Sequence, residues 1–288
     1  MSPFDYEFIG DLLKRRSGLL LAPGKEYLLE SRLMPIVRES GLGSLELLVA
    51  DLRKPGSDAL QTKVTEAMTT NETFFFRDKS PFDMFREDLV PAMLHSRSAE
   101  RRLRIWCAAC STGQEPYSLA MILKEMADRL VNWRIEIVAT DLSGEVLEKA
   151  KVGMYSQFEV QRGMPIAMLV RHFTQIGEMW QIDADIRAMV KFGKLNLLEP
   201  FGDLGRFDIV FCRNVLIYFD QATKRDVLER IGTAMSPDGC LLLGAAETVL
   251  GITDAFQPVA GKRGLYVTPH GEVTAPGIAT RLPALRAI

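Results

Sequence analysis

Short apolar runs alternate with amphipathic stretches from Leu103 onward, and this alternation constrains the fold more than any other feature of the chain. The strand-like run RIEIVATD (134–141) lies between the helix-like stretches PYSLAMILKEMADRL (116–130) and GEVLEKAK (144–151). Further strand-like runs read LRIWCAA, VKFGKLN, FDIVFCRN and CLLLGAA. Strands that alternate with helices favour a parallel sheet with helices on both faces. We therefore predict an α/β domain over residues 103–267.

The first 70 residues show helical periodicity without strand alternation. Their four amphipathic stretches are FDYEFIGDLLKRR, KEYLLESRLMPIVRES, SLELLVADLR and SDALQTKVTEAMT, and glycine or proline residues separate them. This pattern predicts a small all-α domain over residues 1–70.

Three other segments depart from these two patterns. We predict that residues 71–102 form a linker, which carries the stretch NETFFFRD and a connecting helix. The alternation of strands and helices fails over about 155–190, and a small inserted β-subdomain with a hairpin is expected there. Residues 268–288 are rich in Pro, Gly, Ala and Thr, a composition that predicts a flexible C-terminal tail.

The charge balance argues against polyanionic partners. The 288 residues are 47% hydrophobic and 25% charged, with a formal net charge of -2. Nucleic-acid-binding proteins usually carry a basic surface, so duplex DNA and RNA are disfavoured as partners. The first residues, MSPFDYEF, are acidic rather than basic, and no apolar run approaches the ~20 residues of a membrane helix. We expect a cytoplasmic protein without membrane insertion.

The cysteines and histidines do not form a metal-binding pattern. Among the four cysteines, only Cys107 and Cys110 lie close together, and the three histidines are scattered through the chain. Structural zinc requires a second close pair of ligands. We expect buried reduced thiols and no metal.

Small or polar residues follow each predicted strand, where open α/β sheets bind their ligands. The loop 108–113 after the first strand lacks both phosphate-binding glycine motifs, G-x-G-x-x-G and G-x-x-x-x-G-K-[ST]. Its small residues, beginning with Ala108, allow a ligand to approach the backbone closely. Glu115 can meet a cationic group, and Asp141 can accept hydrogen bonds from ribose hydroxyls. These features suit a nucleoside joined to an amino acid, such as S-adenosylmethionine.

Each of these residues also has a purely structural interpretation. Asp141 could be a turn or cap residue, and Glu115 beside a proline is common in the first turn of a helix. Asn196, after the third strand, and Asn214, after the fourth, could form turns. Their joint placement at successive strand ends favours the functional interpretation.

The linker stretch NETFFFRD places three phenylalanines between polar residues. We expect the phenylalanines to form an apolar hinge that packs the helical domain on the sheet. Asn71, Thr73 and Arg77 could instead point into the cleft, where Arg77 could clamp a carboxylate with two hydrogen bonds.

Four stretches, NETFFFRD, WCAACSTGQEPYSLAM, ATDLS with VLEKAK, and FDIVFCRNVLIYFD, resemble the CheR family of chemotaxis receptor methyltransferases. The resemblance implies a helical N-terminal domain, a linker, and a Rossmann-like class I methyltransferase domain with a small inserted β-subdomain. Members transfer a methyl group from S-adenosylmethionine to glutamate side chains of bacterial chemoreceptors, which leaves S-adenosylhomocysteine. The resemblance and the strand-end pattern together assign cofactor contacts to Asn71, Thr73, Arg77, Ala108, Glu115, Asp141, Asn196, Leu197, Arg213 and Asn214.

The same resemblance implies that Tyr218 lies beside the transfer site, although Tyr218 could equally be a core aromatic residue. Our hypothesis is that Arg77 and Tyr218 orient the incoming carboxylate or the methyl donor. A glutamate carboxylate is already anionic at neutral pH, so the transfer needs no general base and depends mainly on positioning. The expected partner is the cytoplasmic helical domain of transmembrane chemoreceptors, and we expect a monomer.

Three segments depart from the family pattern. The receptor-docking helix of the family is arginine-rich, whereas the matching segment here offers only Arg32 and Arg38, with Pro35 between them. The predicted β-subdomain is short compared with members that bind a receptor's C-terminal pentapeptide, so we expect receptor binding without that tether. GAAET at 244–248 also replaces a histidine-bearing version of this loop.

Two other functions compete with this prediction. One is a nucleic-acid or small-molecule methyltransferase on the same scaffold. Methyltransferases that modify nucleic-acid amino groups carry N-P-P-[YF] after the fourth strand, where this chain has Arg213-Asn214-Val215-Leu216. A cofactor- or receptor-binding regulatory homologue with little turnover is the remaining alternative.

Overall fold

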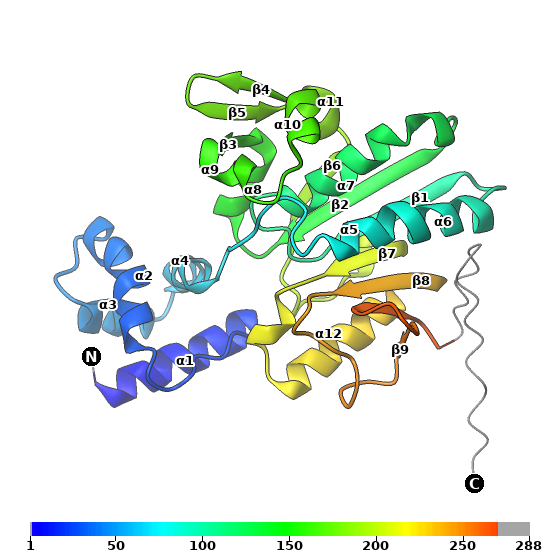
Figure 1. Cartoon of the computed structure of the whole chain (residues 1–288). Coiled ribbons are helices and arrows are strands. Elements are labelled where there is room, and N and C mark those ends of the chain that lie inside the picture. Colours follow the sequence, from blue (N-terminus) through cyan, green and yellow to red (C-terminus); the bar gives the residue numbers. More distant parts are fainter. Residues whose placement is uncertain (1, 270–288) are drawn as a thin grey trace, which may run out of the picture.

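The computed structural model describes residues 2–269 and begins with a four-helix domain (Figure 1). Its helices are α1 (Pro3–Ser17), α2 (Glu26–Glu39), α3 (Leu45–Leu52) and α4 (Asp58–Met68). They pack around a separate apolar core that includes Ile9, Leu33 and Val64. The predicted all-α domain is therefore confirmed. Residues 270–288, which make up most of the predicted tail, lie outside the described residues.

Capping residues define the ends of α1. The Ser2 side chain accepts a hydrogen bond from the Asp5 backbone N–H, and Pro3 occupies the first turn. Gly18 ends the helix in the left-handed conformation, with φ of 76°. Gly18 lies against the larger domain, since a Cβ atom at this position would be 3.0 Å from the Phe219 ring.

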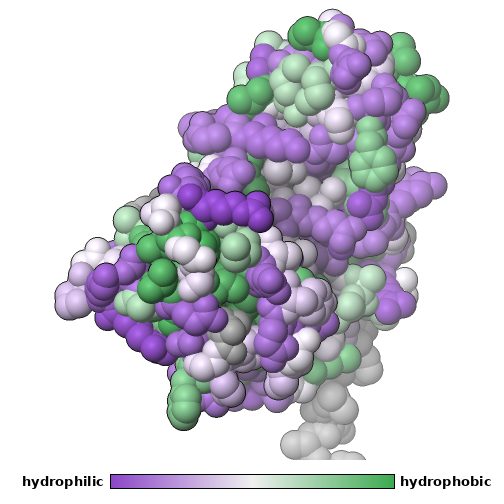
Figure 2. All heavy atoms as spheres, turned by 90° about the vertical axis from the view of Figure 1, so that its left-hand side faces the viewer, coloured by the Kyte–Doolittle hydropathy of each residue, from purple (hydrophilic) through white to green (hydrophobic). Residues whose placement is uncertain are grey.

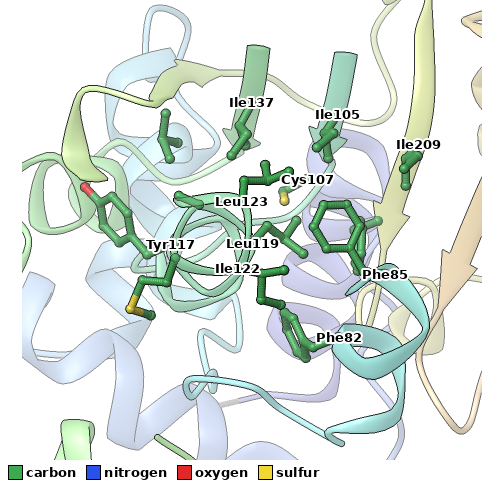
Figure 3. Packing of buried hydrophobic residues seen from close by; sticks show 14 of the residues in the cluster. Phe82, Phe85, Ile105, Cys107, Tyr117, Leu119, Ile122, Leu123, Ile137 and Ile209 are labelled. Carbon is green, nitrogen blue, oxygen red and sulfur yellow. The ribbon is translucent and has the colours of Figure 1, made fainter. Parts of the chain in front are cut away.

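The linker contains a helical segment that leads to the sheet. After an irregular stretch, α5 (Ser80–Met84), a π-helical turn η1 (Phe85–Leu89) and α6 (Val90–Ser96) follow one another. Phe82 and Phe85 pack into the same core as the sheet (Figure 3). The linker is therefore part of the larger domain's packing and not a free tether.

The central sheet has seven strands in the order β6-β2-β1-β7-β8-β10-β9. Their bounds are β1 (Arg102–Cys107), β2 (Arg134–Asp141), β6 (Val190–Lys194), β7 (Phe207–Cys212), β8 (Met235–Leu243), β9 (Gln257–Pro258) and β10 (Leu265–Val267). Neighbouring strands from β6 to β8 pair in parallel, as predicted. β10 pairs antiparallel with both β8 and β9, which adds an antiparallel edge that the strand–helix alternation did not indicate.

Alternating side chains of β1 face two different cores. Ile105 and Cys107 contribute to the core under α7 (Gln114–Glu125), together with Leu119 of that helix (Figure 3). Trp106 contributes to the opposite core, together with Leu228 of α12 (Gln221–Thr233). This period of two places helices on both faces of the sheet. α8 (Gly144–Val152) packs along β2 and β6.

The inserted subdomain combines a three-stranded sheet with short helices. Its strands are β3 (Met154–Ser156), β4 (Phe173–Ile176) and β5 (Met179–Ile182), in the antiparallel order β3-β5-β4. Its helices are α9 (Gln157–Gln161), α10 (Ile166–His172) and α11 (Ala184–Arg187). The expected hairpin is β4–β5, whereas the helices had no counterpart in the prediction.

Short 3₁₀ turns complete the fold at η2 (Ala127–Arg129), η3 (Gly202–Leu204) and η4 (Leu216–Tyr218). The helix expected over 116–130 therefore ends earlier, at Glu125, and η2 follows it. Among residues 2–269, no helix has both the length and the apolar character to cross a membrane. In the same range, no group of three or more His, Cys, Asp or Glu residues is arranged to hold a metal ion. All four cysteines are free and buried, as predicted.

Candidate functional site

One cleft lies at the carboxyl ends of the parallel strands, and the helical domain and linker contribute to its walls. All the predicted site residues of this region line it, although they come from five separate segments of the chain. They are Asn71, Thr73, Arg77, Ala108, Glu115, Asp141, Asn196, Leu197, Arg213, Asn214 and Tyr218. The topology therefore brings together what the sequence placed at successive strand ends.

The Ser-Thr-Gly turn after β1 is fixed on three sides. Ser111 donates its backbone N–H to Asp141 Oδ2 at 2.8 Å and its hydroxyl to the Asn71 carbonyl at 2.9 Å. The Tyr155 hydroxyl donates to the Thr112 carbonyl at 2.8 Å. Ala108 and Ser111 line the cleft, whereas Gly113 does not. Gly113 instead lies at the start of α7. Its φ of 93° and its close neighbours disfavour any side chain at this position.

The Asp141 carboxylate supports the local turn and also faces the cleft. Its Oδ2 accepts from the Ser111 backbone N–H and its Oδ1 from the Ser143 backbone N–H at 3.0 Å. Each carboxylate oxygen has a second lone-pair direction available. Burial raises the pKa of Asp141, and these backbone N–H groups partly offset that rise. The structural and functional interpretations of Asp141 are therefore compatible.

The cation beside Glu115 is Arg213 of the chain itself. Arg213 Nη1 donates to Glu115 Oε2 at 2.7 Å, and Nη2 donates to Asp78 Oδ2 at 2.7 Å. Nη2 also donates to the Arg77 carbonyl at 2.9 Å. Burial raises the pKa of the Glu115 carboxyl, and the Arg213 guanidinium partly offsets it. This network attaches the linker to the start of α7 and to the segment after β7.

Among the described residues, Arg213 keeps a buried donor without a partner. Its Nε is buried and has no hydrogen-bond partner. A buried unpaired donor costs about 1–3 kcal/mol.

Phe74 and Phe75 of the linker have different environments. Phe75 is fully buried and packs edge-to-face on Tyr155 and Phe173, at centroid distances of 5.0 and 5.5 Å. Both partners belong to the inserted subdomain, so the expected packing of Phe75 against the helical domain is wrong. Phe74 is half-buried, and the guanidinium of Arg77 lies 5.6 Å from its ring centroid. Arg77 also donates to the Glu72 carbonyl at 2.6 Å.

The helical domain closes the far end of the cleft. Asn196 donates to the Arg16 carbonyl at 2.7 Å, and the Tyr218 carbonyl accepts from the Leu20 backbone N–H at 2.9 Å. Ser17 and Leu19 line the cleft, although no sequence pattern indicated them. Asn196 and Arg16 are 180 residues apart, so local sequence carries no signal of this contact. Tyr218 lines the cleft and also packs against the apolar core below it.

The two predicted docking arginines differ in their surroundings. Arg32 donates to the carbonyls of Met68 and Thr69 and to the Thr70 hydroxyl. It therefore holds the end of α4 next to the cleft. Arg38 is exposed near the end of α2. Hydrophilic residues cover most of the face on the helical-domain side of the molecule, with apolar groups between them (Figure 2).

Comparison with known families gives a match to each domain. Residues 5–69 match "CheR methyltransferase, all-alpha domain" and residues 71–265 match "CheR methyltransferase, SAM binding domain". Chemotaxis protein methyltransferase Cher2 of Pseudomonas putida is 40% identical over 91% of this chain and 96% of its own length. Chemotaxis protein methyltransferase 1 of Pseudomonas aeruginosa is 41% identical over the same shares.

A more distant relative, the chemotaxis protein methyltransferase of Vibrio anguillarum, is 37% identical over 92% of this chain and 96% of its own length. The relatives and the two family matches thus cover both domains around the cleft. The chain therefore belongs to the CheR methyltransferase family and is an S-adenosylmethionine-dependent methyltransferase of the chemotaxis type.

Proposed function

We propose that this chain methylates glutamate side chains in the cytoplasmic helical domain of bacterial chemoreceptors. The observation that carries the proposal is the cleft, where the strand-end residues, Arg77 and Tyr218 all meet. Its wall combines acidic groups, small residues and a buried arginine. This chemistry matches a nucleoside joined to an amino acid better than a phosphate-rich ligand.

Each part of the cleft has a distinct role in the proposed mechanism. Asp141 accepts hydrogen bonds from ribose hydroxyls, and the positively charged Arg213, which lines the cleft, faces the carboxylate of the cofactor. The bound cofactor supplies a methyl group on a positively charged sulfur. Arg77 and Tyr218 orient the incoming carboxylate, an anion at neutral pH that requires no general base. Alignment of two bound reactants can contribute ~7 kcal/mol or more.

Calorimetry with S-adenosylhomocysteine tests the cofactor part of the proposal. The parent chain should bind, and Asp141→Ala should bind at least about tenfold more weakly, since hydrogen bonds to a charged group contribute about 1.5–3 kcal/mol. Undiminished affinity in the variant would show that the ribose contact is wrongly assigned.

Methyl transfer from labelled S-adenosylmethionine to receptor-containing membranes tests the substrate. Base-labile methyl esters are expected, because esters of glutamate hydrolyse in alkali whereas methylated amines do not. The reaction should proceed equally with receptors that lack the C-terminal pentapeptide. Cofactor binding without transfer would instead support the regulatory homologue.

Arg38 is proposed as a receptor contact because it is exposed. Arg38→Ala should raise the KM for receptor substrate severalfold and leave the melting temperature unchanged. Arg32→Ala should mainly lower the melting temperature, because Arg32 bonds three consecutive residues at the end of α4. An Arg38→Ala variant with normal KM would remove Arg38 from the docking surface.

A further inference from the structure

The Glu247 carboxylate accepts hydrogen bonds from four backbone N–H groups. Its Oε2 accepts from Asn214 at 2.8 Å and from Gly244 at 2.7 Å. Its Oε1 accepts from Val215 at 3.0 Å and from Leu216 at 2.7 Å. These donors follow the ends of two neighbouring parallel strands, β7 and β8. Glu247 itself does not line the cofactor cleft.

The backbone after β7 requires such an acceptor. Asn214 has a positive φ of 59°, a conformation that turns successive N–H groups toward one point and creates an anion-binding concavity. The Glu247 side chain fills this concavity. A half-buried backbone donor without a partner would otherwise cost free energy.

Gly244 leaves the space that this arrangement needs. A Cβ atom on Gly244 would lie 2.7 Å from Glu247 Oε2 and 3.0 Å from the Asn214 backbone nitrogen. Both distances are at or below the limit that real Cβ contacts reach. In the stretch GAAET (244–248), Gly244 therefore leaves space for the carboxylate, and Glu247 binds the neighbouring loop.

We propose that Glu247 is a positioning residue for methyl transfer, an inference that rests on the proposed function of the cleft. By holding the backbone of residues 214–216, it sets where the Asn214 side chain enters the cleft. The same segment continues directly into Tyr218. Glu247 acts only through these residues, because it has no contact with the cleft itself.

Glu247→Gln tests the inference with little change in size. The amide keeps one acceptor oxygen but turns an NH₂ group toward two of the four backbone donors. Affinity for S-adenosylhomocysteine should fall about tenfold, and kcat should fall with it. Glu247→Asp, whose carboxylate is one methylene shorter, should lie between the parent and the glutamine variant. It provides the measurement if Glu247→Gln does not fold.

Glu159→Gln is the matched control. Glu159 also accepts a backbone N–H, from Ser156 at 2.9 Å, but it lies in the inserted subdomain and does not line the cleft. This variant should lose some thermal stability and keep both cofactor affinity and kcat. If Glu247→Gln behaves in the same way, its role is only structural and the inference is wrong.

A double-mutant cycle separates positioning from an independent effect. Because Glu247 acts through Asn214, the Asn214→Ala change should cost much less affinity in the Glu247→Gln background than in the parent. Strictly additive losses would overturn the inference. A parent chain that fails to bind S-adenosylhomocysteine would overturn the proposed function as well, whereas a parent and a Glu247→Gln variant that bind equally would overturn this inference alone.

Discussion

At the scale of single residues, Arg77 and Arg162 form a natural comparison because both guanidinium groups lie over the Phe74 ring. Their distances to its centroid are 5.6 and 4.3 Å. Arg162 also pairs with Glu72, and its side chain is 42% exposed. Only Arg77 lines the cleft.

We predict that Arg77→Ala lowers kcat for methyl transfer by about tenfold or more, because it removes a charged donor beside the reactants. Arg162→Ala should leave kcat nearly unchanged, since an exposed ion pair contributes only about 0–1 kcal/mol. Steady-state transfer from labelled S-adenosylmethionine measures both. Full turnover with unchanged cofactor affinity in Arg77→Ala would exclude Arg77 from the transfer site.

The raised pKa of Asp141 predicts how cofactor binding depends on pH. In the proposed binding mode, ribose hydroxyls donate to the ionised carboxylate, and burial raises its pKa above the ordinary value of 3.8. Affinity for S-adenosylhomocysteine should therefore weaken as the pH falls through this raised pKa. The effect on folding has the opposite sign: the raised pKa stabilises the folded state at low pH, and this contribution is lost as the pH rises through the folded-state value.

Calorimetry from about pH 8 to about pH 4 checks the prediction across the ordinary carboxyl range. Asp141→Asn should bind more weakly at neutral pH and lose most of the pH dependence. The buried Glu115 also has a raised pKa and would remain in the variant. An unchanged pH profile in Asp141→Asn would assign the titration to Glu115.

At the scale of elements, the start of α7 depends on Gly113. This residue has φ of 93°, and a Cβ atom there would lie 3.0 Å from Ala150 Cβ and 3.1 Å from the Tyr117 ring. Gly177, in the β4–β5 hairpin, has φ of 61° with no atom within 4 Å of a built Cβ. The two glycines therefore share backbone strain and differ in crowding.

We predict that Gly113→Ala lowers the free energy of unfolding by about 3 kcal/mol, from left-handed strain together with overpacking. Gly177→Ala should cost only about 1 kcal/mol, from strain alone. Urea denaturation measures both values. Equal losses would show that the neighbours of Gly113 move aside without cost.

The elements themselves were predictable to different degrees. The parallel strands are buried, so they appear in the sequence as apolar runs, and the run 134–141 agrees with β2. β9 and β10 span two and three residues, which is too short for any periodic pattern. β10 pairs antiparallel with β8, and β9 pairs antiparallel with β10, so the directions of both strands follow from contacts between separate parts of the chain.

At the scale of the whole molecule, Glu66 joins the helical domain to the cofactor side of the sheet. Its Oε2 accepts from the Gly144 backbone N–H at 3.0 Å, at the start of α8, and its Oε1 pairs with Lys194 at 2.6 Å. Glu66 therefore supports the segment that follows Asp141. A second contact, between Lys14 and Asp220 at 2.8 Å, joins the domains beside Tyr218.

We predict that Glu66→Gln lowers the free energy of unfolding by about 1–2 kcal/mol and weakens S-adenosylhomocysteine binding severalfold, because charged hydrogen bonds across the domain interface are lost. Glu39→Gln is the control, since the Glu39–Lys63 pair is exposed and lies within the helical domain. Denaturation and calorimetry measure both variants. Unchanged cofactor affinity in Glu66→Gln would mean that the domain interface does not support the cleft.

The sequence by itself determined the local features of this protein: the class of each domain, the alternation of strands and helices, and the residue types at the strand ends. These features depend on neighbouring residues and on the period of burial, which are visible along the chain. The predicted residues that follow the strands lie around one cleft for this reason, because carboxyl ends of parallel strands meet at one edge.

Only the tertiary structure decided which side chains meet. Arg213 binds Glu115 across 98 residues, Asn196 reaches the helical domain, and Glu247 holds the loop before Tyr218. The tertiary structure also places Phe75 against the inserted subdomain and Arg32 against the end of α4. These contacts depend on the order of strands in the sheet and on the placement of the helical domain, and no local pattern of residues records either.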